Sequence, residues 1–169
     1  LASSVDHPHL ERRESVEQRI TVTRSIAASP AAVWAVLTDL DSAPETLRGV
    51  TAVERLDGGA EYGIGTRWRE TRVMFGKSAT EEMQVTESVP EQRTVVTAES
   101  GRARYRTVFE LTPTATGTNL TMEFSGDSGP LGAVQEALMT MVGPLAKRAT
   151  AKALRQDLDD IAAAAESLS

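Results

Sequence analysis

The chain has 169 residues, of which 40% are hydrophobic and 25% are charged, a composition typical of a single globular domain. Its formal net charge of −6, with basic residues spread along the whole sequence, argues against nucleic-acid binding. The chain contains no cysteine, which excludes disulfides, thiolate metal sites and a cysteine nucleophile, and we expect a cytoplasmic location.

Residues 1–18 form a polar segment that lacks the apolar stretch of a signal peptide, and we expect this segment to be a tail. Both histidines, His7 and His9, belong to the tail, so we expect no histidine-based catalysis, no metal ion and no cofactor. The most apolar long stretch, 129–146, is interrupted by charged and amide side chains, which argues against a membrane span. We therefore place one domain at 19–168.

Residues 19–26 alternate between apolar and polar side chains, the pattern of a half-buried strand. Arg24 falls on the apolar face, so it either lies near the end of the strand or faces a polar environment. Ser29 and Pro30 are typical of the N-cap and the first turn of a helix. A second short helix is expected over 41–49.

Turn residues recur at strand spacing over 49–127, which predicts six consecutive antiparallel strands. Helical spacing of apolar residues then continues over 131–168, with a kink expected at Gly143-Pro144. An antiparallel sheet with one apolar face needs a cover, and only this helix is long enough to provide it. We therefore predict an α+β fold: a curved antiparallel sheet of about seven strands wraps around a long, kinked C-terminal helix, with two short helices between strands 1 and 2.

A two-residue turn at Phe75-Gly76 fixes the pairing of the strands on either side of it. The pairs that it places on the inner face are Trp68 with Met83, Glu70 with Glu81, and Arg72 with Ala79. Two carboxylates held together away from water raise the pKa of one of them, unless a cation such as Arg72 neutralises them.

Two alternatives to this assignment stay open. If the register is shifted by one residue, Trp68 and the charged residues face solvent instead of the interior. If the register is right, Glu70, Arg72 and Glu81 can still form a purely structural network near the edge of the sheet. Farther along, a turn at Ser100-Gly101 would pair Val96 with Tyr105 on the inner face.

Five stretches of the sequence carry a resemblance to a known family: IAASPAAVWAVLTDLDSAPE, GIGTRW, SVPEQRTVV, LTPTATGTNLTMEF and GPLAKRATAKALRQDLDDI. In this order they resemble the START-like (SRPBCC, helix-grip) superfamily, and within it the polyketide cyclase/dehydrase and lipid-transfer branch, over 19–167. The resemblance implies a pocket between the concave sheet and the long helix that holds a small, largely apolar molecule. It also implies that Trp34 lies on the first helix, where we expect a core residue and not a ligand contact.

Apolar walls combined with a few polar groups are typical of small-molecule pockets, and the inner-face residues have this character. The ligand-binding candidates are Trp68, Glu70, Arg72, Glu81, Met83, Tyr105, Phe109, Phe124 and Met141. On the last two strands, we expect most of the apolar residues to pack against the long helix: Phe109, Leu111, Leu120, Met122 and Phe124.

Three functions are compatible with this interpretation. The first is a carrier or sensor of a lipid- or polyketide-like molecule. The second is a polyketide cyclase or dehydrase, in which Glu70 or Glu81 acts as general acid or base and Tyr105 assists as a donor. The third is an interaction module similar to the Hsp90-activator branch of the superfamily. A row of arginines at 102, 104 and 106 is either a partner site or simply a solvated strand face.

Overall fold

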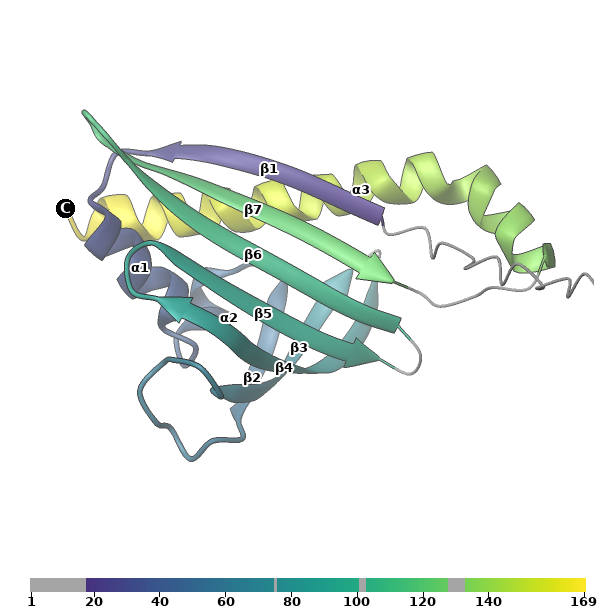
Figure 1. The fold of residues 1–169 in the computed structure, drawn as a ribbon, viewed down its shortest axis with the longest axis horizontal. Coiled ribbons are helices and arrows are strands. Elements are labelled where there is room, and N and C mark those ends of the chain that lie inside the picture. Colours follow the sequence, from purple (N-terminus) through teal and green to yellow (C-terminus); the bar gives the residue numbers. More distant parts are fainter. Residues whose placement is uncertain (1–17, 75, 101–102, 128–132) are drawn as a thin grey trace, which may run out of the picture.

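The computed structural model describes residues 18–74, 76–100, 103–127 and 133–169. The elements follow in the order β1 (Gln18–Ile26), α1 (Pro30–Thr38), α2 (Ala43–Thr46), β2 (Val50–Arg55), β3 (Arg67–Met74), β4 (Lys77–Val89), β5 (Arg93–Ser100), β6 (Ala103–Thr114), β7 (Gly117–Asp127) and α3 (Ala133–Ser167). The strands form one seven-stranded sheet in the order β1-β7-β6-β5-β4-β3-β2, with neighbouring strands antiparallel (Figure 1). The predicted fold is confirmed.

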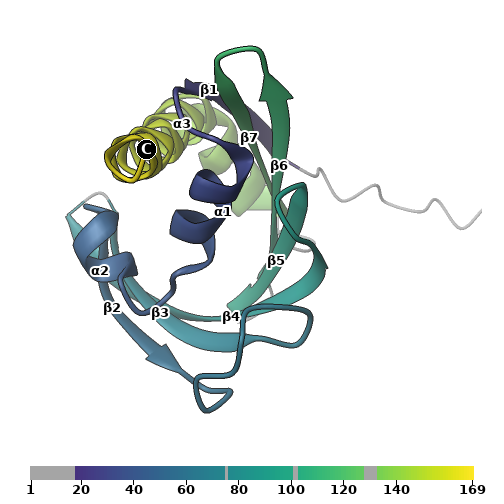
Figure 2. The same cartoon turned by 90° about the vertical axis from the view of Figure 1, so that its left-hand side faces the viewer.

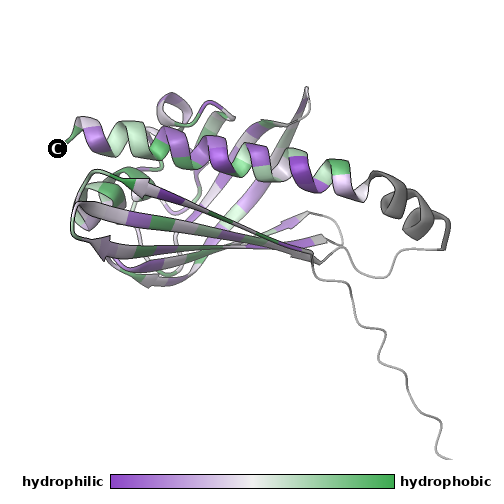
Figure 3. Ribbon diagram, turned by 90° about the horizontal axis from the view of Figure 1, so that it is seen from above, coloured by the Kyte–Doolittle hydropathy of each residue, from purple (hydrophilic) through white to green (hydrophobic). Residues whose placement is uncertain are grey.

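The sheet curls around α3, and the two short helices lie inside its open side (Figure 2). The long helix runs continuously through Pro144 and changes direction in its N-terminal part, which is green in Figure 1. Hydrophilic and hydrophobic residues alternate along it, as a helix with one packed face requires (Figure 3). Along the described ranges, no helix is long and apolar enough to cross a membrane.

The first helix begins as its sequence predicts. The side chain of Ser29 accepts a hydrogen bond of 3.2 Å from the backbone N–H of Ala32, and Pro30 occupies the first turn. Val33 on this helix is fully buried. It joins a large core in which α3 packs against the β1 side of the sheet, formed by residues such as Ile20, Val22, Ile26, Leu120, Leu154, Leu158 and Ile161.

The pairing of β3 with β4 follows the predicted register. Trp68 lies opposite Met83 and Glu70 lies opposite Glu81. Trp68 is only 3% exposed, which rules out the alternative in which this face meets solvent.

The predicted pairing of β5 with β6 is wrong by two residues. Val96 lies opposite Thr107, and Tyr105 lies opposite Ala98. The turn falls one position later in the sequence than we assumed, which moves every partner by two residues. Because side chains alternate with a period of two, Tyr105 stays on the inner face.

Ion pairs connect both edges of the sheet, at β1 and next to β2, to α3. Arg24 of β1 lies 3.4 Å from Asp159, so its place on the apolar face is explained by a polar partner on the helix. Arg48, just before β2, binds Asp160 at 2.8 Å.

The arginine row on the outer face of β6 meets carboxylates of β5 and β4. Arg104 pairs with Glu99 at 3.4 Å and Arg106 with Glu87 at 3.5 Å, which favours a solvated strand face over a partner site. Residue 102 lies outside the described ranges.

Candidate functional site

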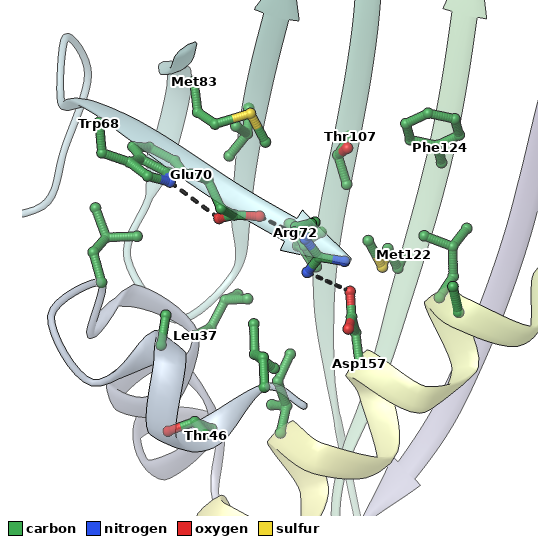
Figure 4. Close-up of a pocket in the computed structure, with 18 of the residues that line it drawn as sticks. Leu37, Thr46, Trp68, Glu70, Arg72, Met83, Thr107, Met122, Phe124 and Asp157 are labelled. Carbon is green, nitrogen blue, oxygen red and sulfur yellow. Dashed lines mark hydrogen bonds and ion pairs between the residues drawn. The ribbon is translucent and has the colours of Figure 1, made fainter. Parts of the chain in front are cut away.

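A cavity of about 370 Å³ lies between α3, the two short helices and the concave face of strands β3 to β7 (Figure 4). Its walls are mainly apolar. Leu37 projects from α1, Met83 from β4, and Met122 and Phe124 from β7, while α3 contributes Leu154. The sheet and helix therefore separate here enough to leave room between them.

The structure brings together the inner-face residues that the sequence singled out. The predicted residues that line the cavity are Trp68, Glu70, Arg72, Glu81, Met83, Tyr105, Phe109 and Phe124. The side chain of Met141 lies outside the described part of the molecule. Trp34 packs against the large core and meets the ring of Tyr62 edge-on at 6.0 Å, and it does not line the cavity, as expected for a core residue.

The expectation that most of the named apolar residues of β6 and β7 pack against α3 agrees with the large core, which contains residues of both strands and of the helix. Leu111, Leu120 and Met122 belong to this core, and Phe109 and Phe124 pack against it. Phe109, Met122 and Phe124 also line the cavity, so these three side chains border both the core and the cavity.

Three hydrogen bonds join four side chains into a continuous polar chain across the cavity wall (Figure 4). The indole Nε1 of Trp68 donates to Glu70 Oε2 at 3.1 Å, and Arg72 Nε donates to Glu70 Oε1 at 2.6 Å. Arg72 Nη2 then donates to Asp157 Oδ2 of α3 at 2.7 Å. Glu70 is 9% exposed and Asp157 only 3%, so two buried carboxyl groups share the single positive charge of Arg72.

Asp157 is a charged residue of the cavity wall that our sequence analysis missed. A signal was available, because Asp157 lies three residues after Leu154 and four before Ile161, on the apolar stripe of the helix. A carboxylate on a stripe that faces a core must find a cation there. Burial raises the pKa of Asp157, and Arg72 offsets part of this rise. In turn, Asp157 and Glu70 raise the pKa of Arg72 although burial opposes its charge.

Glu81 lines the same cavity but takes no part in this row of hydrogen-bonded side chains. Within the described residues, it makes no hydrogen bond and no ion pair. Burial raises the pKa of Glu81, and the neighbouring charge of Glu70 adds to the rise. The structural-network alternative thus describes Glu70 and Arg72, while Glu81 remains available to a bound molecule.

Tyr105 lines the same cavity as Glu81. Its ring stacks on Phe124 with centroids 5.7 Å apart, and its hydroxyl has no partner in the described part of the chain. Burial raises the pKa of Tyr105, and the charge of Glu81 contributes. As far as the described residues go, Glu81 and Tyr105 therefore present to the cavity a carboxyl and a hydroxyl without a hydrogen-bond partner. Over the ranges that the structure describes, no three acidic or histidine side chains are placed to hold a metal ion.

The curled sheet, the enclosed helix and the cavity between them define a helix-grip protein of the START-like superfamily. A family described as "Polyketide cyclase / dehydrase and lipid transport" matches residues 17–166, and the chain belongs to this family. The comparison with curated proteins gives no match.

Several solved structures share the fold. TTHA0849 from Thermus thermophilus has a TM-score of 0.74 at 19% identity, covering 90% of this chain and 99% of that one. The di-domain ARO/CYC StfQ from the steffimycin biosynthetic pathway has a TM-score of 0.74 at 15% identity, covering 93% of this chain and 54% of that one. A START superfamily protein from Mycobacterium smegmatis has a TM-score of 0.65 at 14% identity, covering 90% of this chain and 99% of that one. At such identities the likeness concerns the fold alone.

Proposed function

We propose that the protein binds a small, largely apolar molecule, lipid- or polyketide-like, in the cavity between the sheet and α3, as a carrier or sensor. The observation that carries this proposal is a cavity of about 370 Å³ whose apolar walls surround a few fixed polar groups. The lipid transport named in the family's description agrees with it. We expect the protein to act in the cytoplasm, on the basis of its cysteine-free composition.

The polar groups of the cavity wall fall into two sets, and this difference supports ligand binding. Glu70, Arg72 and Asp157 satisfy one another and hold the wall in place. Glu81 and Tyr105 have no hydrogen-bond partner among the described residues, and both line the space that a ligand would fill. Pre-formed walls with a few polar groups orient a ligand at little entropic cost.

The neutral fluorescent probe N-phenyl-1-naphthylamine provides a direct test, because its emission rises when it enters an apolar site. Met83 lines the cavity, and the next residue, Gln84, is exposed on the opposite face of the strand. We expect the Met83→Trp variant, in which a larger side chain fills part of the cavity, to lose most of the rise in emission, and the Gln84→Trp variant to keep it. Loss of the rise in both variants, or in neither, would contradict the proposal. Native mass spectrometry of protein purified from its own host would then show which small molecule accompanies it.

One observation favours a second candidate, a cyclase or dehydrase. Glu81 has no hydrogen-bond or ion-pair partner among the described residues, burial raises its pKa, and it lies on the cavity wall together with Tyr105. A carboxyl of this kind can exchange a proton with a bound molecule. If the protein is such an enzyme, Glu81→Gln abolishes turnover but keeps ligand binding. If it is a carrier, neither form shows turnover.

An interaction module of the Hsp90-activator kind receives less support, because the exposed large apolar side chains are scattered. In the described ranges they are Ile64, Val73, Val89, Leu145 and Leu168. Leu145 and Leu168 lie near opposite ends of the same helix, and Val73 and Val89 lie near opposite ends of the β3–β4 pair. They form no contiguous surface of the kind that binds partner proteins.

A further inference from the structure

The charged residues around the cavity are unequal in number. The carboxyl side chains that line it are Asp39, Glu70, Glu81 and Asp157. Of the described residues that line it, only Arg72 carries a positive charge. The walls therefore carry an excess of carboxyl groups over cations.

The guanidinium of Arg72 is already committed. It donates to Glu70 at 2.6 Å and to Asp157 at 2.7 Å, so two carboxylates share one positive charge. A ligand carboxylate could reach full neutralisation by Arg72 only by displacing one of them. The displaced carboxylate would remain buried without a counter-charge, which is strongly unfavourable.

The pKa values of other groups in the wall are shifted in a consistent direction. Burial raises the pKa values of Glu81 and Asp157, Arg72 opposes both rises, and Glu70 adds to both. Burial raises the pKa of Tyr105, and Glu81 adds to the effect. Each of these groups is shifted toward its protonated form mainly because burial disfavours its negative charge, and a neighbouring carboxylate adds to the shift. A negative charge brought in by a ligand meets the same opposition.

We infer that the cavity selects ligands whose polar group is a neutral or cationic hydrogen-bond donor, such as a hydroxyl or a protonated amine, and rejects carboxylates. Glu81 is the acceptor for that donor, since it faces the cavity without a partner among the described residues. The inference rests on the proposed function and narrows it: an apolar body is held by the walls, and the charge of its head group decides affinity.

A matched set of ligands tests this selectivity. Decylamine, decanol and decanoate share one alkyl chain and differ in head-group charge at pH 7. Each would compete with bound N-phenyl-1-naphthylamine at concentrations below micelle formation. We expect the amine and the alcohol to displace the probe at concentrations at least about tenfold lower than decanoate, because one nearby like charge is worth about one pKa unit or more.

Two carboxyl-to-amide variants on the same strand assign the effect. Glu81→Gln removes the unpaired carboxyl from the cavity and should bring decanoate closer to decylamine by about threefold or more. Glu82→Gln is the matched control, because Glu82 is exposed on the opposite face, where it binds Arg67 at 2.7 Å. The control should leave the order and spacing of the three ligands unchanged. A third variant, Asp157→Asn, releases one side of Arg72 and should improve decanoate most of the three.

The possible outcomes separate this inference from the proposed function. If the naphthylamine probe does not bind, the proposed function fails and this inference fails with it. If the probe binds and decanoate displaces it as well as decylamine does, the selectivity is refuted while the proposed function stands. Failure of decylamine and decanol to compete at all would also refute the selectivity. An equal effect of Glu81→Gln and Glu82→Gln would refute the role of Glu81.

Discussion

The β1–β7 half of the inner sheet face and the β3–β4 half meet the same helix in different ways. In the first, Val22, Leu120 and Leu158 belong to one continuous buried core. In the second, Trp68, Val85 and Val96 form a separate smaller cluster, and the cavity lies between this region and α3. The helix touches this second half through the ion pair of Arg72 with Asp157. Apolar packing holds the first half against α3. In the second half, the Arg72–Asp157 ion pair forms a polar bridge between the sheet and the helix beside the cavity.

Removing the bridge should have the largest effect on stability. Arg72→Leu leaves the buried carboxyl groups of Glu70 and Asp157 without a cation, and we expect a loss of roughly 3–5 kcal/mol of unfolding free energy at pH 7. In the variant the folded-state pKa of Asp157, which burial already raises, rises further because Arg72 no longer lowers it. The folded variant then binds more protons than the unfolded variant. Lowering the pH from 7 to 5 should therefore reduce the difference in unfolding free energy between the variant and the wild type. Urea unfolding at the two pH values measures this.

A charge-neutral variant provides the control for Arg72→Leu. When Glu70→Gln and Asp157→Asn are added to it, no buried charge remains among these three positions, and most of the lost stability should return. If the combined variant is as unstable as Arg72→Leu alone, the loss comes from packing and not from uncompensated charge.

Truncation of one apolar side chain in each half tests the contrast in packing. Leu158→Ala in the large core should cost about 2–5 kcal/mol, because Leu158 is 1% exposed and its removal opens a new cavity. Met83→Ala should cost only about 1 kcal/mol, because Met83 is half-buried and borders space that already exists. Equal losses in urea unfolding would mean that the two halves are packed alike.

The smallest effect concerns Glu81. Its folded-state pKa is raised, so its contribution to stability is present at low pH and is lost as the pH rises through that value. Glu81→Gln removes this loss and should stabilise the protein at pH 7.5 by roughly 0.5 kcal/mol or less, since the side chain is half-exposed and water screens it. Thermal unfolding at pH 4 should show no difference. A gain of the same size for Glu82→Gln would assign the effect to general surface charge.

The sheet could be predicted from the sequence because its rules are local. The position of the turn after Met74 sets the register of β3 and β4, and the period of two then brings Trp68, Glu70 and Arg72 to one face. Where the turn was misplaced, as before β6, partners were wrong by two residues but the face was right. Alternation along a strand therefore survives an error in the turn.

The helical side of the site could not be predicted in the same way. The rotation of α3 about its axis depends on how residues such as Leu158 and Ile161 pack against β1 and β7, far away in the sequence. The same applies to Leu37 and Thr46, which reach the cavity from α1 and α2. Their positions depend on how three helices dock together, and no spacing within one segment encodes that.

The order of elements along the chain has a consequence for synthesis. Asp157, Asp159 and Asp160 lie within about one turn of α3, and each binds an arginine from a different part of the sheet or its border. The strands leave the ribosome before this turn does. Until it arrives, the concave face lacks its helical cover, so the nascent strands expose apolar side chains that the folded protein buries. The cavity between the sheet and the helix can therefore form only after this turn of α3 has been synthesised.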